Sequence, residues 1–280
     1  MPLLILLNNI TFKFNYLLFL FKSLSVIGAQ GIHAITEHGR WGCFTLRLFV
    51  SVFRPPFKFS SVIKEIKVIG VESLSIIVFT ALFTGMVLGL QGYTTLKQFG
   101  SEGLLGIGVT ASLFSELGPV LTALLLIGRA GSSLCAQIGV MRNSEQIDAL
   151  ECMGIDPFNF LISPKLLAAI IVFPILSFLF CIVGTGGGYF AGVYLLGVNP
   201  GAYYDGMVRA LYNPTHVDMC LYKSLCFSVL MISICACKGY YVHMHKVKGA
   251  LAVARCTTEA VVFSSVSILI WDYLITSILI

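Results

Sequence analysis

Five long apolar runs separated by short polar stretches dominate the pattern of this chain. They are residues 73–91, 104–127, 166–196, 225–237 and 260–280. A helix of about 20 mainly apolar residues crosses roughly 30 Å of hydrocarbon, and the fourth run reaches that length only with its flanks. The pattern predicts an all-α integral membrane protein with five transmembrane helices.

The third run, 166–196, is too long for one upright helix and contains Pro174. We interpret it as one long, tilted helix, because a tight reversal inside lipid would leave backbone groups unpaired. Gly184, Gly188 and Gly192 recur every fourth residue, so they share one helix face and let another helix approach closely. A phosphate-binding loop, the alternative, would need a strand-to-helix context that the sequence lacks. Glycines at the same spacing recur in the first run: Gly85 and Gly89.

Basic residues predict the orientation of these spans, because loops rich in lysine and arginine stay in the cytoplasm. Those before the first span are Lys13, Lys22, Arg40, Arg47, Arg54, Lys58, Lys64 and Lys67. Those between the fourth and fifth spans are Lys238, Lys246, Lys248 and Arg255. The opposite side carries only Lys97, Arg209 and the boundary residue Lys223. We therefore expect a cytoplasmic N-terminus, a periplasmic C-terminus and a cytoplasmic loop between the second and third spans.

The portion before the first span, residues 1–70, differs from the rest of the chain. Apolar and polar residues are mixed in its segments 12–24 and 41–49. Such mixed segments suit helices that lie in the membrane interface. We therefore divide the chain into an N-terminal interfacial and cytoplasmic helical region, 1–70, and a transmembrane domain, 71–280.

Composition and charge narrow the class of function. Hydrophobic residues make up 57% of the chain, above the roughly 45–50% of soluble domains. The net charge of +5 follows from the cytoplasmic loops, so no nucleic-acid partner is needed. The nine cysteines form no CxxC pair, and we expect small buried hydrophobes rather than metal ligands or disulfides. G-x-S-x-G and H-E-x-x-H motifs are absent, so we expect no catalytic residue, metal site or cofactor in this chain.

A polar insert, 128–157, separates the second and third spans. Asn143 or Ser144 can cap a short helix there, Glu145 favours its N-terminal end, and Gly154 can stop it. The residues that would supply apolar contacts are Ile147, Leu150 and Met153. Two interpretations stay open: an amphipathic helix that docks on a partner, and a merely solvated loop.

Three stretches form a specific combination: FTGMVLGLQGY (83–93), SELGPV through PKLLA (115–168) and ARCTTEAVVFSS (254–265). With them, the chain from about Gly39 onward resembles the MlaE/YrbE family of ABC-transporter permeases. The resemblance implies a homodimeric permease in a bacterial inner membrane that moves phospholipids between inner and outer membranes. It implies a cytoplasmic ATPase and an MCE-domain substrate-binding protein as partners, with a STAS-domain subunit in some members. A chloroplast inner-envelope relative is the alternative location.

The same resemblance gives the polar insert a role. Residues 145–150, EQIDAL, match the family's cytoplasmic coupling helix, within a coupling loop of about 129–165. The matching positions are Glu145, Gln146, Asp148 and Leu150, followed by the glycine turn at Gly154. The chain has no G-x-x-x-x-G-K-[ST] phosphate loop. We therefore expect a permease subunit that is not itself an enzyme, with ATP hydrolysed by a partner subunit.

Glu116 is the first candidate for the substrate cavity, because an ionisable group near the middle of a span is rare, and the resemblance places its motif near the lipid cavity. A carboxylate that merely pairs with a neighbouring span is the alternative. Lys223 matches a basic position of the family and could meet a lipid phosphate or snorkel to the interface. Asp272, in the fifth span, could neutralise a basic neighbour. Apolar candidates for the cavity wall are Leu82, Met86, Leu90 and Leu113.

Two residues depart from the family pattern. Gln137 stands where the family commonly has Glu, and Glu259 stands where some members have a basic residue. A different class of function also stays open: a stand-alone channel or ion-coupled secondary transporter, in which Glu116 and Asp272 would bind the ion.

Overall fold

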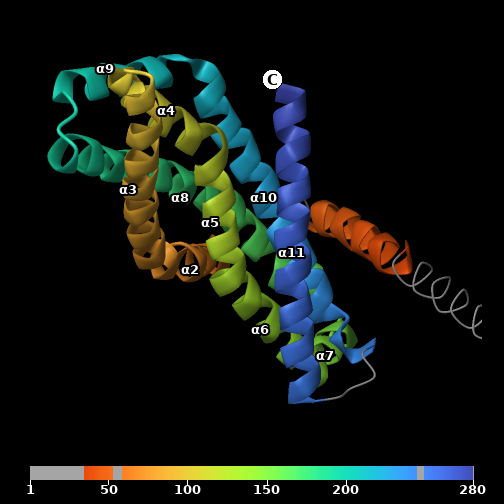
Figure 1. Ribbon diagram of the computed structural model, residues 1–280. Coiled ribbons are helices and arrows are strands. Elements are labelled where there is room, and N and C mark those ends of the chain that lie inside the picture. The colour runs from red at the N-terminus through yellow and green to blue at the C-terminus, as the bar shows by residue number, and fades with distance from the viewer. Residues whose placement is uncertain (1–34, 53–58, 245–248, 280) are drawn as a thin grey trace, which may run out of the picture. The chain divides into compact units, whose positions relative to one another are not determined.

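The computed structural model describes residues 35–52, 59–244 and 249–279 (Figure 1). All regular structure in these ranges is helical, so the predicted all-α class is confirmed. The chain divides into two compact units, Met1–Leu46 and Arg47–Ile280. The larger unit holds every predicted span. The predicted interfacial segment 12–24 lies outside the described residues.

Five helical stretches of the larger unit are long and apolar enough to cross a membrane. They are Phe59–Gln98, Glu102–Asn143, Phe158–Leu195, Pro214–Tyr240 and Ala250–Leu279. Each of the five predicted runs overlaps one of them. The stretches are longer than the apolar runs because the helices continue through polar residues at their ends.

These stretches and their connections contain the following elements in chain order. They are α2 (Phe59–Ile69), η1 (Val71–Ser73), α3 (Leu74–Gln98), η2 (Glu102–Leu104), α4 (Leu105–Ser112), η3 (Leu113–Leu117), α5 (Gly118–Leu126), η4 (Ile127–Gly131), α6 (Ser132–Asn143), α7 (Gln146–Cys152), η5 (Phe158–Ile162), α8 (Ser163–Tyr189), η6 (Phe190–Leu195), α9 (Pro200–Tyr212), α10 (Pro214–Tyr240), η7 (Val242–Met244) and α11 (Ala250–Leu279).

The first stretch bends at Gly70, between α2 and α3, and Figure 1 shows the two helices running in different directions. A Cβ added at Gly70 would lie 2.7 Å from the carbonyl oxygen of Ile66 and 3.3 Å from Val172 on α8. Glycine therefore lets α2 turn under α3 and pack on α8. The predicted domain boundary at residue 70 coincides with this bend, while α2 itself belongs to the larger unit.

The second stretch contains two π-helical turns, η3 and η4. Pro119 follows η3 and has no amide hydrogen, so the α-helical hydrogen bond to the carbonyl of Ser115 cannot form. A π turn accommodates such an interruption without ending the helix, and π turns occur often at functional sites. Gly118 directly follows the π turn η3. The thiol of Cys181 in α8 donates to the carbonyl oxygen of Leu113, in this turn, at 3.4 Å. This interrupted segment therefore packs directly on α8.

Glycine faces bring α3 and α8 together within one chain. A Cβ at Gly85 would lie 1.8 Å from the carbonyl oxygen of Gly184, and one at Gly89 would lie 3.0 Å from that of Gly188. Added Cβ atoms at Gly188 and Gly192 would instead meet side chains of α4 and α9. The structure thus places the three predicted packing glycines, Gly184 and Gly188 of α8 and Gly192 of η6, against α3, α4 and α9.

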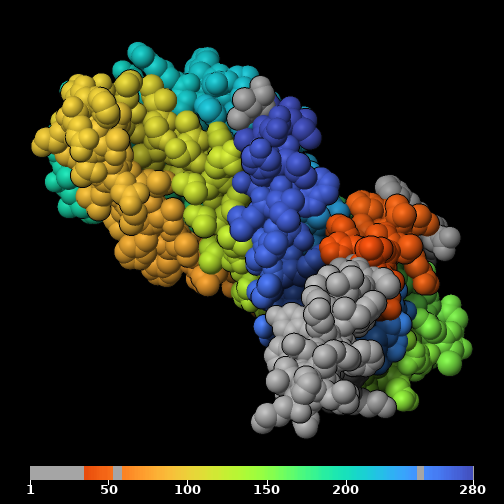
Figure 2. Space-filling view, turned by 45° about the vertical axis from the view of Figure 1, so that its right-hand side comes forward, coloured from red at the N-terminus to blue at the C-terminus, as the bar shows by residue number. Residues whose placement is uncertain are grey.

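Helices α10 and α11 differ in burial. Of the five membrane-spanning stretches, α10 is the most buried inside the unit and α11 the least. Figure 2 shows α11, in blue, as an exposed ridge on the surface of the molecule. Polar residues of α10 therefore meet protein, and this is why a basic residue can lie inside it. Before α10, the helix α9 begins at Pro200, and the side chain of its N-cap residue, Asn199, accepts from the Gly201 amide at 2.8 Å.

Candidate functional site

Three ionisable residues meet inside the helical bundle, and we call them the buried ion triad: Glu116, Lys223 and Asp272. Lys223 lies in α10 and its side chain is 0% exposed. Its Nζ forms an ion pair with Asp272 Oδ1 of α11 at 2.7 Å and a second pair with Glu116 Oε2 of η3. The triad therefore joins three of the five membrane-spanning stretches.

Burial differs among the members of the triad. The side chain of Asp272 is 18% exposed and that of Glu116 is 39% exposed. Thr276, one helical turn after Asp272 in α11, donates from Oγ1 to Glu116 Oε1 at 3.0 Å. An unpaired charge is costly in a membrane interior, so each carboxylate stabilises Lys223 there. Glu116 is the member that can reach a group outside the bundle.

Neighbouring polar residues extend this cluster. Ser115 Oγ lies 2.6 Å from Nδ1 of His216, at the start of α10. Ser115 and Glu116 are both in the π turn η3, so the irregular turn presents two consecutive polar side chains to α10. From the sequence we expected Lys223 to lie at the outer end of the fourth span, where it could snorkel to the membrane interface or meet a lipid phosphate. Instead it is fully buried, because the carboxylates that neutralise it come from two other helices.

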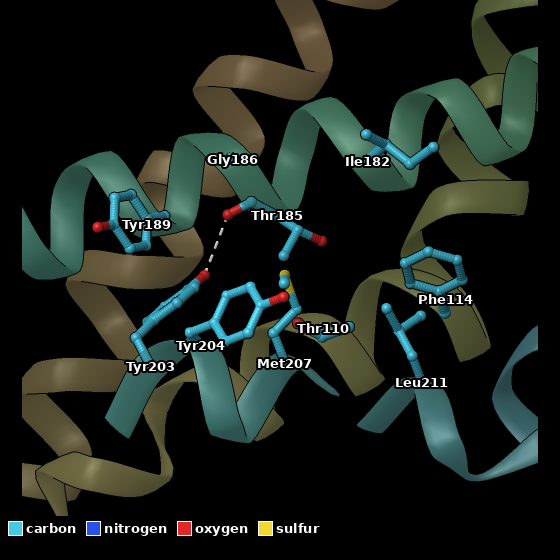
Figure 3. A pocket seen from close by; sticks show the side chains of 10 residues that line it. All are labelled: Thr110, Phe114, Ile182, Thr185, Gly186, Tyr189, Tyr203, Tyr204, Met207 and Leu211. Atoms are coloured by element: carbon cyan, nitrogen blue, oxygen red, sulfur yellow. Dashed lines mark hydrogen bonds between the residues drawn. The ribbon is translucent and has the colours of Figure 1, made fainter. Parts of the chain in front are cut away.

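A separate cavity of about 410 Å³ lies between α4, η3, α8 and α9 (Figure 3), and we call it the tyrosine pocket. Its lining residues are Thr110, Phe114, Ile182, Thr185, Gly186, Tyr189, Tyr203, Tyr204, Met207 and Leu211. Tyr203 donates to the carbonyl of Thr185 at 3.1 Å. Burial raises the pKa of Tyr203, so its phenol keeps the proton that this hydrogen bond needs.

The residues predicted to line a cavity do not line the tyrosine pocket. Leu82 and Leu90 are exposed on α3, and Met86 is partly buried there. Leu113 is fully buried, and its side chain lies close to the position of an added Cβ on Gly184. Its role in the structure is packing between η3 and α8, because the glycine opposite it leaves room for a large side chain.

Sequence reasoning missed all ten lining residues of this pocket. One signal was present: α9 contains the pair Tyr203-Tyr204 in a short segment that connects two spans. Tyrosine is amphipathic and favours boundaries between apolar and polar surroundings. Which residues of α8 and α4 face that pair depends on the packing of three helices, and periodicity alone does not show it.

The predicted coupling segment forms α7, a helix of seven residues. Ile147 is fully buried. Arg142, at the end of α6, donates to Asp148 Oδ1 at 2.6 Å, and Tyr240, at the end of α10, donates to Glu151 Oε1 at 2.9 Å. The segment is therefore a helix attached to both α6 and α10, and the alternative of a merely solvated loop does not describe it.

Both ends of α7 have left-handed backbone residues. Gly154 has φ of 74°, and two hydrogen bonds close the helix there, from Gly154 N to Glu151 O at 3.0 Å and from Ile155 N to Leu150 O at 3.0 Å. At the other end the expected cap was wrong: neither Asn143 nor Ser144 caps the helix. The N-cap is Glu145 itself, with φ of 59° and no side-chain capping hydrogen bond, because α6 continues to Asn143 and leaves only a tight turn.

The outer surface of this region combines polar and apolar groups. Glu145 and Gln146 are exposed, and Leu150 is partly buried. Two large apolar side chains just after α7 are exposed, Met153 at 65% and Ile155 at 37%. The exposed apolar edge thus lies just beyond the C-terminus of α7 rather than at Leu150.

The two departures from the family pattern have local partners. Gln137 Oε1 accepts from Lys165 Nζ at 2.8 Å, and Lys165 also pairs with Glu65 of α2 at 2.7 Å. Lys165 is buried, so a neutral acceptor beside one carboxylate satisfies it without a second negative charge. Glu259 of α11 lies 3.6 Å from Lys238 of α10, where a basic residue would be repelled.

Metal and cysteine chemistry is limited in the part of the chain that the structure describes. Within those ranges, no group of three His, Cys, Asp or Glu residues could hold a metal ion. Six of the nine cysteines are buried: Cys135, Cys181, Cys220, Cys235, Cys237 and Cys256. The expectation of burial was wrong for Cys152 and Cys226, which are exposed, and Cys43 is exposed as well.

Comparison with known proteins gives one consistent result. The model of the family described as Permease MlaE matches residues 62–278. A probable ABC transporter permease protein of Rickettsia bellii is 40% identical over 252 residues, covering 90% of this chain and 95% of the relative. The intermembrane phospholipid transport system permease protein MlaE of Haemophilus influenzae is 38% identical over 256 residues, covering 91% and 97%. The chloroplastic protein TRIGALACTOSYLDIACYLGLYCEROL 1 of Arabidopsis thaliana is 30% identical over 232 residues, covering 82% and 65%.

Proposed function

Because this chain belongs to the MlaE permease family, we propose that it is the permease subunit of an ABC transporter that moves phospholipids between the inner and outer membranes. The family match over residues 62–278 carries the proposal, because it extends through all five membrane-spanning stretches and α7. The name of the Haemophilus relative supplies the substrate class.

The proposal includes partners. A separate cytoplasmic ATPase hydrolyses ATP, an MCE-domain protein exchanges lipid on the outer face, and a second copy of this chain completes the permease. A STAS-domain subunit joins on the cytoplasmic side in systems that have one. The protein lies in a bacterial inner membrane with its N-terminus in the cytoplasm and its C-terminus in the periplasm. The basic residues before the first span and between the fourth and fifth spans support this orientation.

In this function α7 is the element that receives motion from the ATPase. It is tied to α6 through Arg142 and to α10 through Tyr240, and the Arg142 guanidinium lies 5.0 Å from the centre of the Tyr240 ring. Tyr240 and Lys223 are both in α10, 17 residues apart, which is about 25 Å along a helix. A displacement of α7 therefore reaches the buried ion triad through one rigid helix.

The triad is placed to respond to that motion. A shift of α10 relative to α11 would lengthen the 2.7 Å contact between Lys223 and Asp272, and an unpaired charge in the membrane interior is unfavourable. Glu116, the most exposed member, is where we place the polar headgroup of the phospholipid. Transport in this scheme couples rearrangement of the ion pairs to passage of the headgroup.

Reconstitution tests the proposal. The full chain is placed in liposomes with its ATPase and MCE-domain partners, together with a fluorescent phospholipid. We expect lipid transfer that requires ATP and stops when the catalytic glutamate of the ATPase is replaced with glutamine. The ion-coupled alternative predicts ion flux through the permease alone, driven by a gradient and indifferent to ATP. That result, with no lipid transfer, would overturn the proposal.

A further inference from the structure

The tyrosine pocket is uncharged, although charged residues lie close to it in the sequence. Its ten lining residues include no Asp, Glu, Lys, Arg or His. Asp205 and Arg209 of α9 are exposed and follow Tyr204 by one and five positions, which puts them on other faces of the helix than Met207 and Leu211. The part of a ligand that enters the pocket is therefore neutral and mainly apolar.

One polar atom in the pocket wall lacks a partner. Thr110 is 1% exposed, and its Oγ1 makes no hydrogen bond among the described residues. Most buried hydroxyl groups have a partner, and leaving one unpaired is unfavourable. Figure 3 shows the Tyr204 phenol extending into the pocket on the same side as Thr110. A ligand that offers one hydrogen-bond acceptor at this depth would satisfy Thr110.

The pocket is open enough for a chain to enter from the side. Gly186 forms part of the wall, and a Cβ added there would meet nothing within 4 Å. Ile182, one turn earlier on the same face of α8, is 63% exposed. Both residues lie in the third membrane-spanning stretch. The opening is therefore on the outer surface of α8, where the bilayer would lie, and not in the interior of the bundle.

The position of the pocket identifies the occupant. Helix α9 connects the third and fourth spans, so the pocket lies near one boundary of the hydrocarbon region, where the ester groups of glycerolipids are found. We propose that the tyrosine pocket binds one acyl chain of a bilayer glycerolipid, with Thr110 Oγ1 donating to the ester carbonyl at the head of that chain. The cavity of about 410 Å³ is within the range of small-molecule sites.

This site is distinct from the buried ion triad and does not depend on the proposed transport function, because any diacyl lipid of the membrane can enter it. Phe114, on the pocket wall, packs against Cys181 and Cys220 together with Phe178 and Val217. Phe114 lies on the same π turn as Glu116, and Cys220 lies on the same helix as Lys223. The occupant of the pocket is thus adjacent to the transport machinery without contacting its charges.

Photo-crosslinking tests the proposal on the full chain in nanodiscs. The probe is a diester phosphatidylcholine with a diazirine near the start of one acyl chain, and mass spectrometry measures labelling of peptides from α8 and α9 relative to α11. Because α11 is the exposed helix, its labelling reports ordinary lipid contact. We expect Gly186→Leu to fill the pocket and lower the ratio about tenfold, while Gly186→Ala, which adds only a methyl group, leaves it near the wild-type value.

Thr110→Val tests the hydrogen bond, because valine keeps the shape and removes the hydroxyl. We expect labelling by the diester probe to fall about threefold to tenfold, and labelling by the matched ether-linked probe, which has no carbonyl, to stay unchanged. Equal ratios in wild type and Gly186→Leu would show that α8 and α9 meet only ordinary bilayer lipid and would overturn the proposal. It would also be overturned if labelling disappeared when the ATPase and MCE-domain protein were bound, since the pocket would then belong to a protein interface.

Discussion

At the scale of single residues, Lys223 shows how a charge is held inside this membrane protein. Its side chain is fully buried and contacts two carboxylates from different helices. Neither carboxylate is near it in the sequence: Glu116 precedes it by 107 positions and Asp272 follows by 49. The ion pairs therefore depend on the packing of the complete bundle, and removal of Lys223 leaves both carboxylates uncompensated.

Lys223→Met should destabilise the protein, because it leaves Glu116 and Asp272 beside each other without their cation. We expect a loss of about 3–5 kcal/mol, typical of a buried pair that loses one member, seen as a lower melting temperature in detergent. The triple variant Lys223→Met, Glu116→Gln, Asp272→Asn should recover most of that loss, since no buried charge is left. A single variant as stable as wild type would contradict the ion pairing.

Glu116→Gln should separate stability from transport. The pair between Lys223 and Asp272 at 2.7 Å is kept, and the amide oxygen can still accept from Thr276, so we expect the melting temperature to change little. ATP-dependent lipid transfer should fall at least severalfold, because the most exposed charge of the triad is lost. Both quantities are measured on one preparation. Unchanged transfer would show that Glu116 has no part in handling lipid.

At the scale of elements, α7 is short but firmly attached. It has seven residues, fewer than an isolated helix needs to be stable, so its stability comes from Ile147 in the core and from the bonds to Arg142 and Tyr240. A surface attached in this way can transmit force between a partner and the spans. The exposed apolar side chains that would contact the partner are Met153 and Ile155.

Met153→Arg should weaken binding of the ATPase while leaving the permease folded. Met153 is 65% exposed, so a charge there disturbs an interface and not the core. We expect less ATPase to copurify with the variant and an unchanged melting temperature. Tyr212→Ala, at an exposed position at the end of α9, is the control and should copurify normally. Leu150→Arg is a poorer test, because Leu150 is partly buried and the variant would also disturb packing.

The contact between α3 and α8 predicts opposite effects for two glycine substitutions. Gly85→Ala places a Cβ 1.8 Å from the carbonyl oxygen of Gly184, so the helices must separate, and we expect the melting temperature to fall. Gly108→Ala adds a Cβ that meets nothing within 4 Å. Alanine favours helix over glycine by about 1 kcal/mol, so this variant should be as stable as wild type or more so. Equal effects at both positions would contradict the close approach of α3 and α8.

At the scale of the whole molecule, the two ends of the bundle differ. Figure 1 shows α7 at one end and α9 at the other. The proposed orientation puts α7 in the cytoplasm, where an ATPase can reach it, and α9 at the outer face, where an MCE-domain protein can receive lipid. The least buried of the spanning helices, α11, leaves an apolar surface for lipid or for a second copy.

Thiol labelling tests this orientation. Cys152 of α7 is exposed, and so is Tyr212 at the end of α9. In a variant whose only cysteine is Cys152, a membrane-impermeant maleimide should label inverted vesicles and spare intact spheroplasts. A variant whose only cysteine comes from Tyr212→Cys should show the reverse. Labelling of Cys152 in intact spheroplasts would show that the topology is the reverse of the proposed one. Helix α7 would then be out of reach of a cytoplasmic ATPase.

The sequence alone determined the class of the protein and the position of its spans. Each apolar run predicted a membrane helix because insertion depends on the summed transfer free energy of consecutive residues, which is a local property. The polar insert and the turn at Gly154 could be located for the same reason, since a left-handed glycine at a helix end is encoded by a few neighbouring residues. The N-cap at Glu145 was missed because it depends on where α6 ends.

Only the tertiary structure decided which side chains meet. The partners of Lys223, the burial of Leu113 beside Gly184 and the tyrosine pocket each require two or three helices whose sequences are far apart. A glycine face indicates that some helix approaches closely, but it does not identify the helix. Contacts of this kind depend on the fit of side-chain shapes and on how buried charges can be paired, and both are properties of the packed bundle rather than of any one segment.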